Sequence, residues 1–394
     1  MTDFDAVIVG ASLAGSATAI HLGRAGARVA LVERKTDPNA FKRVCGHFIQ
    51  ASAVPALRRL GVLEELEALG APRGRPRVWC PYGWIEPHGD RDEMRSLSIR
   101  REVLDPLLRR RAAETPGVEL MLGRTVDGVE PGRVHVRDGG TLTAKLIVGA
   151  DGRGSKTAKL AGLATRTRPN ARFAYWGYFE GPPLGTGASV HIWFHGRDVG
   201  IVTPTDGGLM LYVAFPTLDR APAFKRDIEG ELRAFTAALP DAPPIAESKL
   251  VGPLVGKLDL TNEWRATTGR NIALVGDAAL AADPVGAIGC GWALQSAEWL
   301  ADAVTPALHG EEPLARGLKR YRRTHRRHLM GHSRMVAQAA LAKPMNPLQK
   351  LIFSAAVRDP GDRCARGGVR VAHRPCDLAA LAARARPGGA RERC

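Results

Sequence analysis

Long apolar runs and targeting signals are missing from this chain of 394 residues. It has no run of about eighteen apolar residues, the length that a membrane-spanning helix needs. Its N-terminus, MTDFDAVIVG, lacks the basic, apolar and small-residue order of a signal peptide. We therefore expect a soluble cytoplasmic protein without integral membrane association.

Cysteine is also scarce. The six cysteines form no CxxC pair, which argues against a zinc site or a disulfide framework and fits a reducing compartment. They are Cys45, Cys80, Cys290, Cys364, Cys376 and Cys394. We expect no metal centre. Hydrophobic residues make up 45% and charged residues 24% of the chain, a balance that excludes a disordered or fibrous protein.

Lysine supplies only 11 of the 56 basic residues, and the net charge of +16 is unevenly distributed. Residues 311–394 hold 19 Lys and Arg against 6 Asp and Glu, whereas residues 1–310 hold 37 against 34. The basic stretch at 316–327 has a single tyrosine, too few aromatic side chains to stack on bases. We expect no nucleic-acid partner and interpret this stretch as a solvated helix face packed against the rest of the protein. An anionic membrane surface and an acidic carrier protein are the alternatives.

A strand, a glycine turn, a helix and a second strand open the chain. The apolar β-branched run at 5–9 predicts a strand that ends at Gly10, and an alanine-rich helix pattern follows at 14–24. A second apolar run at 29–32 predicts a strand that ends at Glu33. This order is typical of the first βαβ unit of a dinucleotide-binding fold.

The turn itself reads Gly10-Ala-Ser12-Leu-Ala14-Gly15, with serine at the middle glycine of the GxGxxG pattern. The outer glycines permit a tight turn and close packing of helix on strand, and the helix N-terminus stabilises a pyrophosphate. Glu33 is placed to accept hydrogen bonds from a ribose hydroxyl and would repel a 2′-phosphate. We therefore expect this turn to bind a dinucleotide other than NADP.

The middle of the chain changes from βαβ patterns to aromatic, alternating strands. Helix patterns occur at 52–60, 101–114 and 290–308, and buried-strand patterns at 118–122, 133–136, 142–148 and 271–278. Between 172 and 215 the segments RFAYWGYFEG, SVHIWFHG and GLMLYVAF alternate in polarity and are separated by turn residues, which predicts an antiparallel sheet.

Two further motifs complete a constellation with the glycine turn. One is Val148-Gly-Ala-Asp151-Gly152, and the other is Val275-Gly276-Asp277-Ala-Ala followed by Pro284-Val-Gly286-Ala287-Ile-Gly289. In this order the motifs resemble the group A flavoprotein monooxygenases, the para-hydroxybenzoate hydroxylase-like family. The resemblance covers about residues 5–310, and the geranylgeranyl-reductase-like flavoproteins share the same architecture.

The resemblance implies that FAD is the cofactor and NAD(P)H a transient co-substrate. It implies that Asp277 binds the ribityl or ribose hydroxyls, and that Asp151 and Gly152 serve both FAD and NAD(P)H. Arg101 would contact the flavin side chain, and Arg43 would lie near the ring. The cofactor-binding residues expected on this basis are Gly10, Ser12, Ala14, Gly15, Glu33, Arg34, Arg43, Arg101, Asp151, Gly152, Gly276, Asp277, Pro284, Gly286, Ala287 and Gly289.

In this family NAD(P)H reduces the flavin, and oxygen then adds to it as a C4a-hydroperoxide. The resemblance therefore implies hydroxylation or epoxidation of a small substrate, and the aromatic strands favour an aromatic or polyketide-like one. The expected substrate contacts are Tyr175, Trp176, Tyr178, His191 and Trp193. His47 is the candidate catalytic residue, as a base or as a hydrogen-bond donor at the ring; a buried structural role is the alternative.

The chain departs from the family pattern at three positions. Cys290-Gly291 replaces Leu-Asn after Gly289, Leu280 replaces a histidine, and Ser296 replaces an aspartate. The geranylgeranyl-reductase-like branch often has a cysteine soon after the first βαβ unit, so a flavin-dependent reductase of a carbon–carbon double bond is kept as the main alternative. An FAD dehydrogenase and a nucleotide-binding regulatory protein that uses its basic tail to bind a partner are the others. The WxWxIP segment of flavin halogenases is missing, which argues against halogenation.

The expected fold class is α/β, a Rossmann-type FAD-binding domain with an inserted antiparallel β-sheet substrate domain and a C-terminal helical extension. The FAD-binding domain is expected at 1–75, 99–170 and 260–310, the sheet domain at 76–98 and 171–259, the helices at 311–360 and an arginine-rich disordered tail at 361–394. We expect a monomer or a homodimer.

Overall fold

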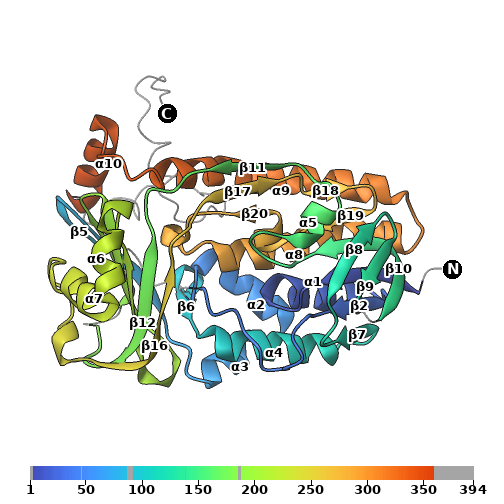
Figure 1. Ribbon diagram of the computed structural model, residues 1–394, viewed down its shortest axis with the longest axis horizontal. Coiled ribbons are helices and arrows are strands. Elements are labelled where there is room, and N and C mark those ends of the chain that lie inside the picture. Colours follow the sequence, from blue (N-terminus) through green and yellow to red (C-terminus); the bar gives the residue numbers. More distant parts are fainter. Residues whose placement is uncertain (1–2, 46, 87–91, 138, 185–187, 359–394) are drawn as a thin grey trace, which may run out of the picture.

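In the computed structural model, two large β-sheets lie toward opposite ends of an elongated molecule, and helix α9 (Leu314–Ala339) runs along the upper edge of the view (Figure 1). The structure describes residues 3–45, 47–86, 92–137, 139–184 and 188–358. The expected tail at 361–394 lies outside these residues.

The first sheet has β1 (Phe4–Val9) at its centre. Its main strands follow the order β19 (Ile272–Leu274), β10 (Gly140–Gly149), β1, β2 (Val29–Val32) and β7 (Val118–Met121), and all four neighbouring pairs are parallel. Buried parallel strands need apolar side chains on both faces. In β1, Ile8 packs toward helix α1 (Leu13–Arg24), and Val7 packs toward the hairpin of β8 (Val126–Glu130) and β9 (Arg133–Val136).

Helix α1 is held between two other helices, α4 (Arg101–Ala113) and α8 (Gly289–Leu308). The three helices come from distant parts of the chain, and their N-terminal ends bring the sequence motifs together. The predicted helices and strands of this part are confirmed, with ends shifted by at most four residues; the largest shift is at the strand predicted over 271–278, which ends at Leu274. The α/β class with a Rossmann-type sheet is confirmed as well.

The second sheet has nine strands and carries the aromatic segments. Its order is β16 (Lys249–Lys257), β12 (Ala174–Glu180), β15 (Met210–Phe215), β14 (Asp198–Pro204), β13 (Ala188–His195), β4 (Arg73–Cys80), β6 (Ser96–Ser98) and β3 (Phe48–Ile49), with β5 (Gly83–Ile85) paired to β4. The sheet is antiparallel as predicted, except that β13 and β4 are parallel. Strands β14 and β16 were not predicted individually, because glycine and proline interrupt their alternation.

Smaller elements connect these layers. The helices are α2 (Val54–Leu60), α3 (Leu63–Ala68), α5 (Lys156–Leu160), α6 (Ala221–Arg226), α7 (Ile228–Ala237) and α10 (Pro347–Arg358), and the strands are β11 (Thr165–Arg168), β17 (Asn262–Arg265), β18 (Thr268–Gly269) and β20 (Leu280–Ala281). Helices α6 and α7 pack on the outer face of the second sheet, at the left of Figure 1. None of the helices in the described part of the chain is long and apolar enough to cross a bilayer.

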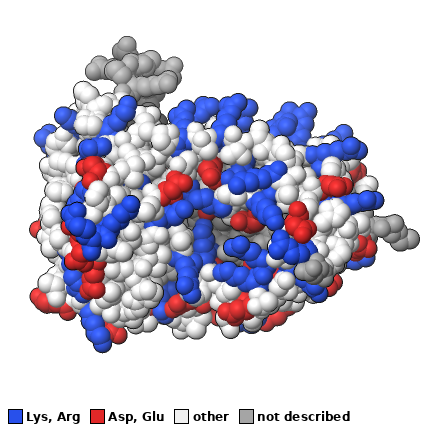
Figure 2. Space-filling model, in the orientation of Figure 1, with Lys and Arg blue, Asp and Glu red and all other residues white. Residues whose placement is uncertain are grey.

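Helix α9 carries much of the basic charge that the sequence concentrates after residue 310. Lys and Arg gather along the edge that α9 forms in Figure 2, whereas elsewhere on this face they are interspersed with Asp and Glu. The other side of the helix is anchored, because the Tyr321 hydroxyl donates to the Leu274 carbonyl (2.6 Å) and the Trp264 indole N–H donates to Ser333 Oγ (3.0 Å). The stretch at 316–327 thus lies in a packed helix that turns its basic side chains to solvent, as predicted.

Candidate active site

The glycine turn between β1 and α1 is closed too tightly for larger residues. Gly10 has φ +103°, and a Cβ there would lie 2.7 Å from the Ala150 carbonyl oxygen. A Cβ on Gly15 would lie 1.7 Å from the Gly10 carbonyl oxygen. Ser12 is the N-cap of α1, but its side chain does not cap the helix. The first amide N–H groups of α1 are therefore free to bind an anion, as helix N-termini do.

Glu33 lies at the end of β2 with its side chain buried. One carboxylate oxygen accepts a hydrogen bond from the Ala11 amide (2.9 Å) and the other from the Lys35 amide (3.0 Å). These bonds fix the carboxylate beside the glycine turn, where it was predicted. Arg34 next to it points into solvent.

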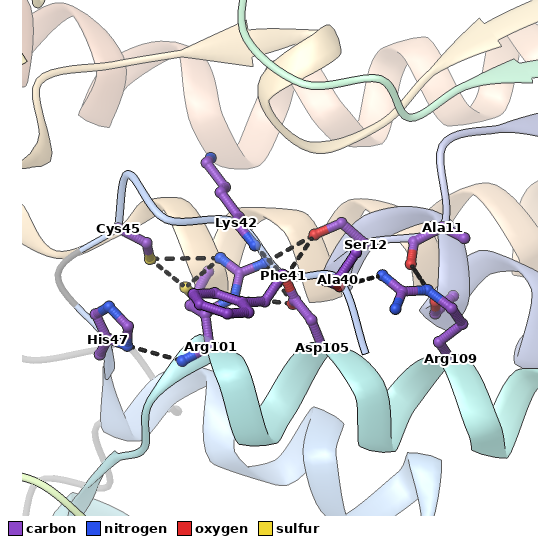
Figure 3. A network of polar contacts seen from close by, with 12 residues as sticks. Ala11, Ser12, Ala40, Phe41, Lys42, Cys45, His47, Arg101, Asp105 and Arg109 are labelled. Carbon is purple, nitrogen blue, oxygen red and sulfur yellow. Dashed lines mark hydrogen bonds and ion pairs between the residues drawn. The ribbon is translucent and has the colours of Figure 1, made fainter. Parts of the chain in front are cut away.

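A buried ion pair connects α4 to the turn (Figure 3). The Arg101 guanidinium donates to Asp105 through Nε (2.9 Å) and Nη2 (2.6 Å), and Nη2 also donates to Ser12 Oγ (2.8 Å). Burial lowers the pKa of Arg101, but Asp105 and two nearby cysteines raise it by more, so the net pKa lies well above its ordinary value. The serine at the middle position of the fingerprint thus has a polar partner that glycine could not have.

Sequence reasoning missed Asp105. Its spacing of four residues from Arg101 on one helix was the available signal, because such residues share a helix face. Asp105 is fully buried and also accepts a hydrogen bond from the Lys42 amide (2.9 Å). It therefore joins α4, the glycine turn and the loop after β2.

Asp277 of the GD motif lies between that loop and α8. Its Oδ2 is 2.7 Å from Lys42 Nζ, and its Oδ1 lies 3.8 Å from where a Cβ on Gly289 would be. Burial raises the pKa of Asp277, but Lys42 together with the charges of Arg153 and Arg101 lowers it by more, so the net shift is downward. Gly276 has φ +57°, and a Cβ there would lie 2.9 Å from the Ala14 side chain, which explains both small residues.

Lys42, and not its neighbour Arg43, turns toward the GD motif, where it pairs with Asp277. Arg43 is exposed, and the structure does not bring it to the site. The two cations are neighbours in the sequence, so their order alone did not reveal which one turns inward.

The segment 284–289 leads into α8. Asp283 accepts a hydrogen bond from the Val285 amide (2.9 Å), and Gln50 donates to the Gly286 carbonyl (2.6 Å). Ala287 is held at φ +49°, and α8 then begins at Gly289 without a side-chain cap. The first amides of α8 are again free donors.

The Asp151 carboxylate of the DG motif binds to the first turn of α5. It accepts from Ser155 Oγ (2.5 Å) and from the Thr157 amide (2.8 Å), so it stabilises the start of α5. Gly152 follows with φ +78° and open space around it.

His47 connects α4 to the aromatic sheet. Its Nδ1 accepts the Arg101 backbone N–H (2.8 Å), as Figure 3 shows, and its Nε2 lies 2.7 Å from the Tyr178 hydroxyl. A backbone N–H can only donate, so the neutral ring carries its proton on Nε2 and donates it to Tyr178. Burial lowers the pKa of His47 to about 4, which keeps this tautomer neutral. Both ring nitrogens are thus bonded within the chain and the ring is buried, which argues against a free base and fits the structural role that was the alternative.

The five predicted substrate residues are divided between the two faces of the second sheet. Trp176 and Tyr178 lie on the face that packs against Val285 and Ala287. On the other face are Tyr175, His191 and Trp193, which pack with α6, α7 and Trp84. For these last three residues the structure corrects the expected substrate contact. Alternate strand residues point to opposite faces, so they belong to the core beneath the helices.

The residues present fit the FAD that the resemblance implies. The α1 and α8 N-termini offer free amides for a pyrophosphate and for the electron-rich edge of a reduced flavin. Arg101 offers a buried cation, and Glu33 and Asp277 offer carboxylates that accept bonds from ribose and ribityl hydroxyls. These groups converge from four separate stretches of chain.

Known proteins support this assignment. The chain is 31% identical over 309 residues to kynurenine 3-monooxygenase of Salinispora tropica, covering 71% of this chain and 67% of that protein. Its fold is similar to p-nitrophenol 4-monooxygenase PnpA of Pseudomonas putida (TM-score 0.75, 20% identity, 92% and 94% of the two chains). It is also similar to the myxobacterial chondrochloren halogenase CndH (TM-score 0.74, 21% identity, 92% and 91%). Residues 3–336 match the family described as "FAD binding domain", and the chain belongs to this family of group A, FAD-dependent flavoprotein monooxygenases.

Proposed function

We propose that this FAD-dependent monooxygenase hydroxylates a small aromatic substrate that carries an ionisable hydroxyl group, bound at the Tyr178 hydroxyl beside the segment 284–289. The names of two relatives, kynurenine 3-monooxygenase and p-nitrophenol 4-monooxygenase, support an aromatic substrate. Bound FAD supplies the redox chemistry: it takes a hydride from NAD(P)H and activates oxygen for transfer of one atom to the substrate.

The hydrogen bond between His47 and Tyr178 carries this proposal. The His47 ring donates through Nε2, so the Tyr178 oxygen is an acceptor in that bond and its own proton is left for another acceptor. Burial raises the pKa of Tyr178 well above its ordinary value, so the phenol stays protonated. A protonated phenol donates well to an anionic oxygen, such as that of a phenolate.

The apolar surroundings suit a flat substrate. Trp176, Leu211 and Val213 are buried on the same face as Tyr178, with Val285 opposite. Apolar walls exclude water, which strengthens the hydrogen bond from Tyr178 to a charged oxygen and so favours the ionised form of the substrate hydroxyl.

The cofactor-binding roles given above to Glu33, Arg101, Asp277 and the α1 and α8 amides belong to this proposal, and Lys42 is added to them. Asp151 is proposed to act through the α5 start rather than on the nucleotide directly. The domain boundaries expected from the sequence, a cytoplasmic location and a monomeric or homodimeric state are proposed with it.

The test is oxygen incorporation with a panel of phenols, aminophenols and nitrophenols. We expect one of these classes to stimulate NADH or NADPH oxidation and to gain a single oxygen atom, which carries the label when ¹⁸O₂ is supplied. The rate should not depend on added chloride or bromide. Gain of two hydrogens without label would favour the double-bond reductase, and a protein that retains no FAD after reconstitution would contradict the proposal.

A further inference from the structure

Two cysteines that are 245 residues apart in the sequence meet beside Arg101. Cys45 Sγ and Cys290 Sγ are 3.8 Å apart. Arg101 Nη1 lies 3.4 Å from the first sulfur and 3.9 Å from the second. Cys45 belongs to the loop between Lys42 and His47, and Cys290 is the second residue of α8. The pair therefore lies where the proposed flavin site and the His47–Tyr178 contact adjoin.

The surroundings give the two thiols different properties. The hydrogen bond from Cys290 and the charges of Arg101 and Lys42 bring the pKa of Cys45 well below its ordinary value, against the effect of burial. The same hydrogen bond and burial raise the pKa of Cys290. A thiolate beside a cation is the reactive form of cysteine, and a neighbouring thiol can resolve its oxidation product.

Cys80 shows the contrast within the same chain. It is fully buried, its Sγ contacts the Gly83 carbonyl at 3.4 Å, and burial raises its pKa. Among the described residues, no cation contacts the Cys80 sulfur. Buried thiols of this kind are inert.

We propose that Cys45 and Cys290 form a redox-active dithiol that hydrogen peroxide converts to a disulfide, linking the loop before His47 to α8. The Cys45 thiolate attacks one peroxide oxygen, the O–O bond breaks, and hydroxide leaves to give a sulfenic acid and, after protonation, water. The Cys290 sulfur then attacks the Cys45 sulfur, and the S–O bond breaks. The departing hydroxide takes the Cys290 proton as a second water, so two thiols and one peroxide give one disulfide and two waters.

The geometry permits this closure. A disulfide has its sulfurs about 2.05 Å apart, so the two atoms must approach by roughly 1.8 Å. The bond would remove the thiolate from Arg101 and tie the Lys42–His47 loop to the α8 N-terminus. The inference rests on the proposed function only for the source of peroxide, because reduced flavin and oxygen release peroxide when no substrate is oxidised.

The experiment exposes the full FAD-loaded chain to one equivalent of hydrogen peroxide and maps cysteines by mass spectrometry without reduction. We expect a linked Cys45–Cys290 peptide that dithiothreitol cleaves, formed at least ten times faster than any oxidation of Cys80. Cys290→Ser should leave Cys45 as a sulfenic acid that dimedone traps, and Cys45→Ser should leave Cys290 unmodified. Cys80→Ser is the matched control and should form the linked peptide at the wild-type rate.

Three results would overturn the proposal. The first is that both cysteines stay free under these conditions while FAD remains bound. The second is that Cys45 pairs with a cysteine other than Cys290. The third is that the disulfide forms under nitrogen, without added peroxide, while the FAD bleaches. FAD and not peroxide would then be the oxidant. Since peroxide is added, the outcome does not depend on whether the protein hydroxylates an aromatic substrate.

Discussion

Lys42 Nζ lies 2.7 Å from Asp277 Oδ2, although 235 residues separate the two in the sequence. This ion pair connects the loop after β2 to the GD motif, and both side chains are partly accessible to solvent. A cation there keeps Asp277 ionised, since Lys42 lowers the pKa of that carboxyl. An ionised carboxylate is the better acceptor for ribityl hydroxyls.

Replacement of Lys42 should therefore weaken FAD binding. We expect Lys42→Ala to raise the Kd for FAD about tenfold, equivalent to about 1.4 kcal/mol, because Asp277 loses its partner. Arg43→Ala is the matched control and should change the Kd less than twofold, since Arg43 is exposed. Titration of flavin fluorescence with apoprotein measures both constants. Equal effects of the two substitutions would contradict the assignment of Lys42.

Removal of the Tyr178 hydroxyl should impair turnover without affecting FAD. We expect Tyr178→Phe to lower kcat with the aromatic substrate about 10- to 100-fold, the effect of losing a charge-assisted hydrogen bond worth about 1.5–3 kcal/mol. FAD affinity should stay within twofold of wild type. The readout is product formed per NAD(P)H oxidised.

Tyr175→Phe provides the comparison for Tyr178→Phe. Tyr175 is three residues away on the same strand but stacks on Phe224 on the helix-covered face. Its replacement should leave kcat within twofold. If both variants lose activity to the same extent, the face assigned to the substrate is wrong.

Alanine at Gly15 should destabilise the fold. The added Cβ would lie 1.7 Å from the Gly10 carbonyl oxygen, so α1 must move away from β1. We expect a loss of about 3 kcal/mol or more in the free energy of unfolding, together with loss of bound FAD. Gly331→Ala, where a Cβ would meet no atom within 4 Å, should instead stabilise α9 by about 0.5–1 kcal/mol. Urea unfolding of both variants checks the prediction.

Acid should destabilise the protein through buried His325 of α9. Burial lowers the pKa of His325 from 6.5 to about 4. The unfolded chain therefore binds the proton first, and stability is complete above pH 6.5 and falls as the pH drops toward 4. One such histidine contributes a slope of at most about 1.4 kcal/mol per pH unit.

His325→Leu should reduce that slope, as measured by urea unfolding at several pH values between 4 and 7. Gly331→Ala, which removes no titratable group from α9, should leave the slope unchanged. An unaltered slope in His325→Leu would show that other groups carry the pH dependence.

Local patterns predicted the main helices and strands of the first sheet, because β-branched runs, glycine turns and alanine-rich segments determine structure within a few residues of sequence. The pairing of distant side chains was not predictable in this way. Asp105, Lys42 and Tyr178 lie in ordinary surroundings in the sequence, and only folding brings them to Ser12, Asp277 and His47. The aromatic strands were predicted correctly, but which of their residues face the nucleotide domain depends on the layer that covers each face.

The parallel sheet also sets an order for synthesis of the protein. Strand β10 pairs with β1 on one side and with β19 on the other, and β19 begins only at Ile272. A nascent chain that has reached Gly149 therefore has an open strand edge for the time needed to make more than a hundred further residues, on the order of 10 s. Open strand edges template aggregation. Recovery of active protein should therefore depend on chaperone supply during translation more than on the stability of the finished fold.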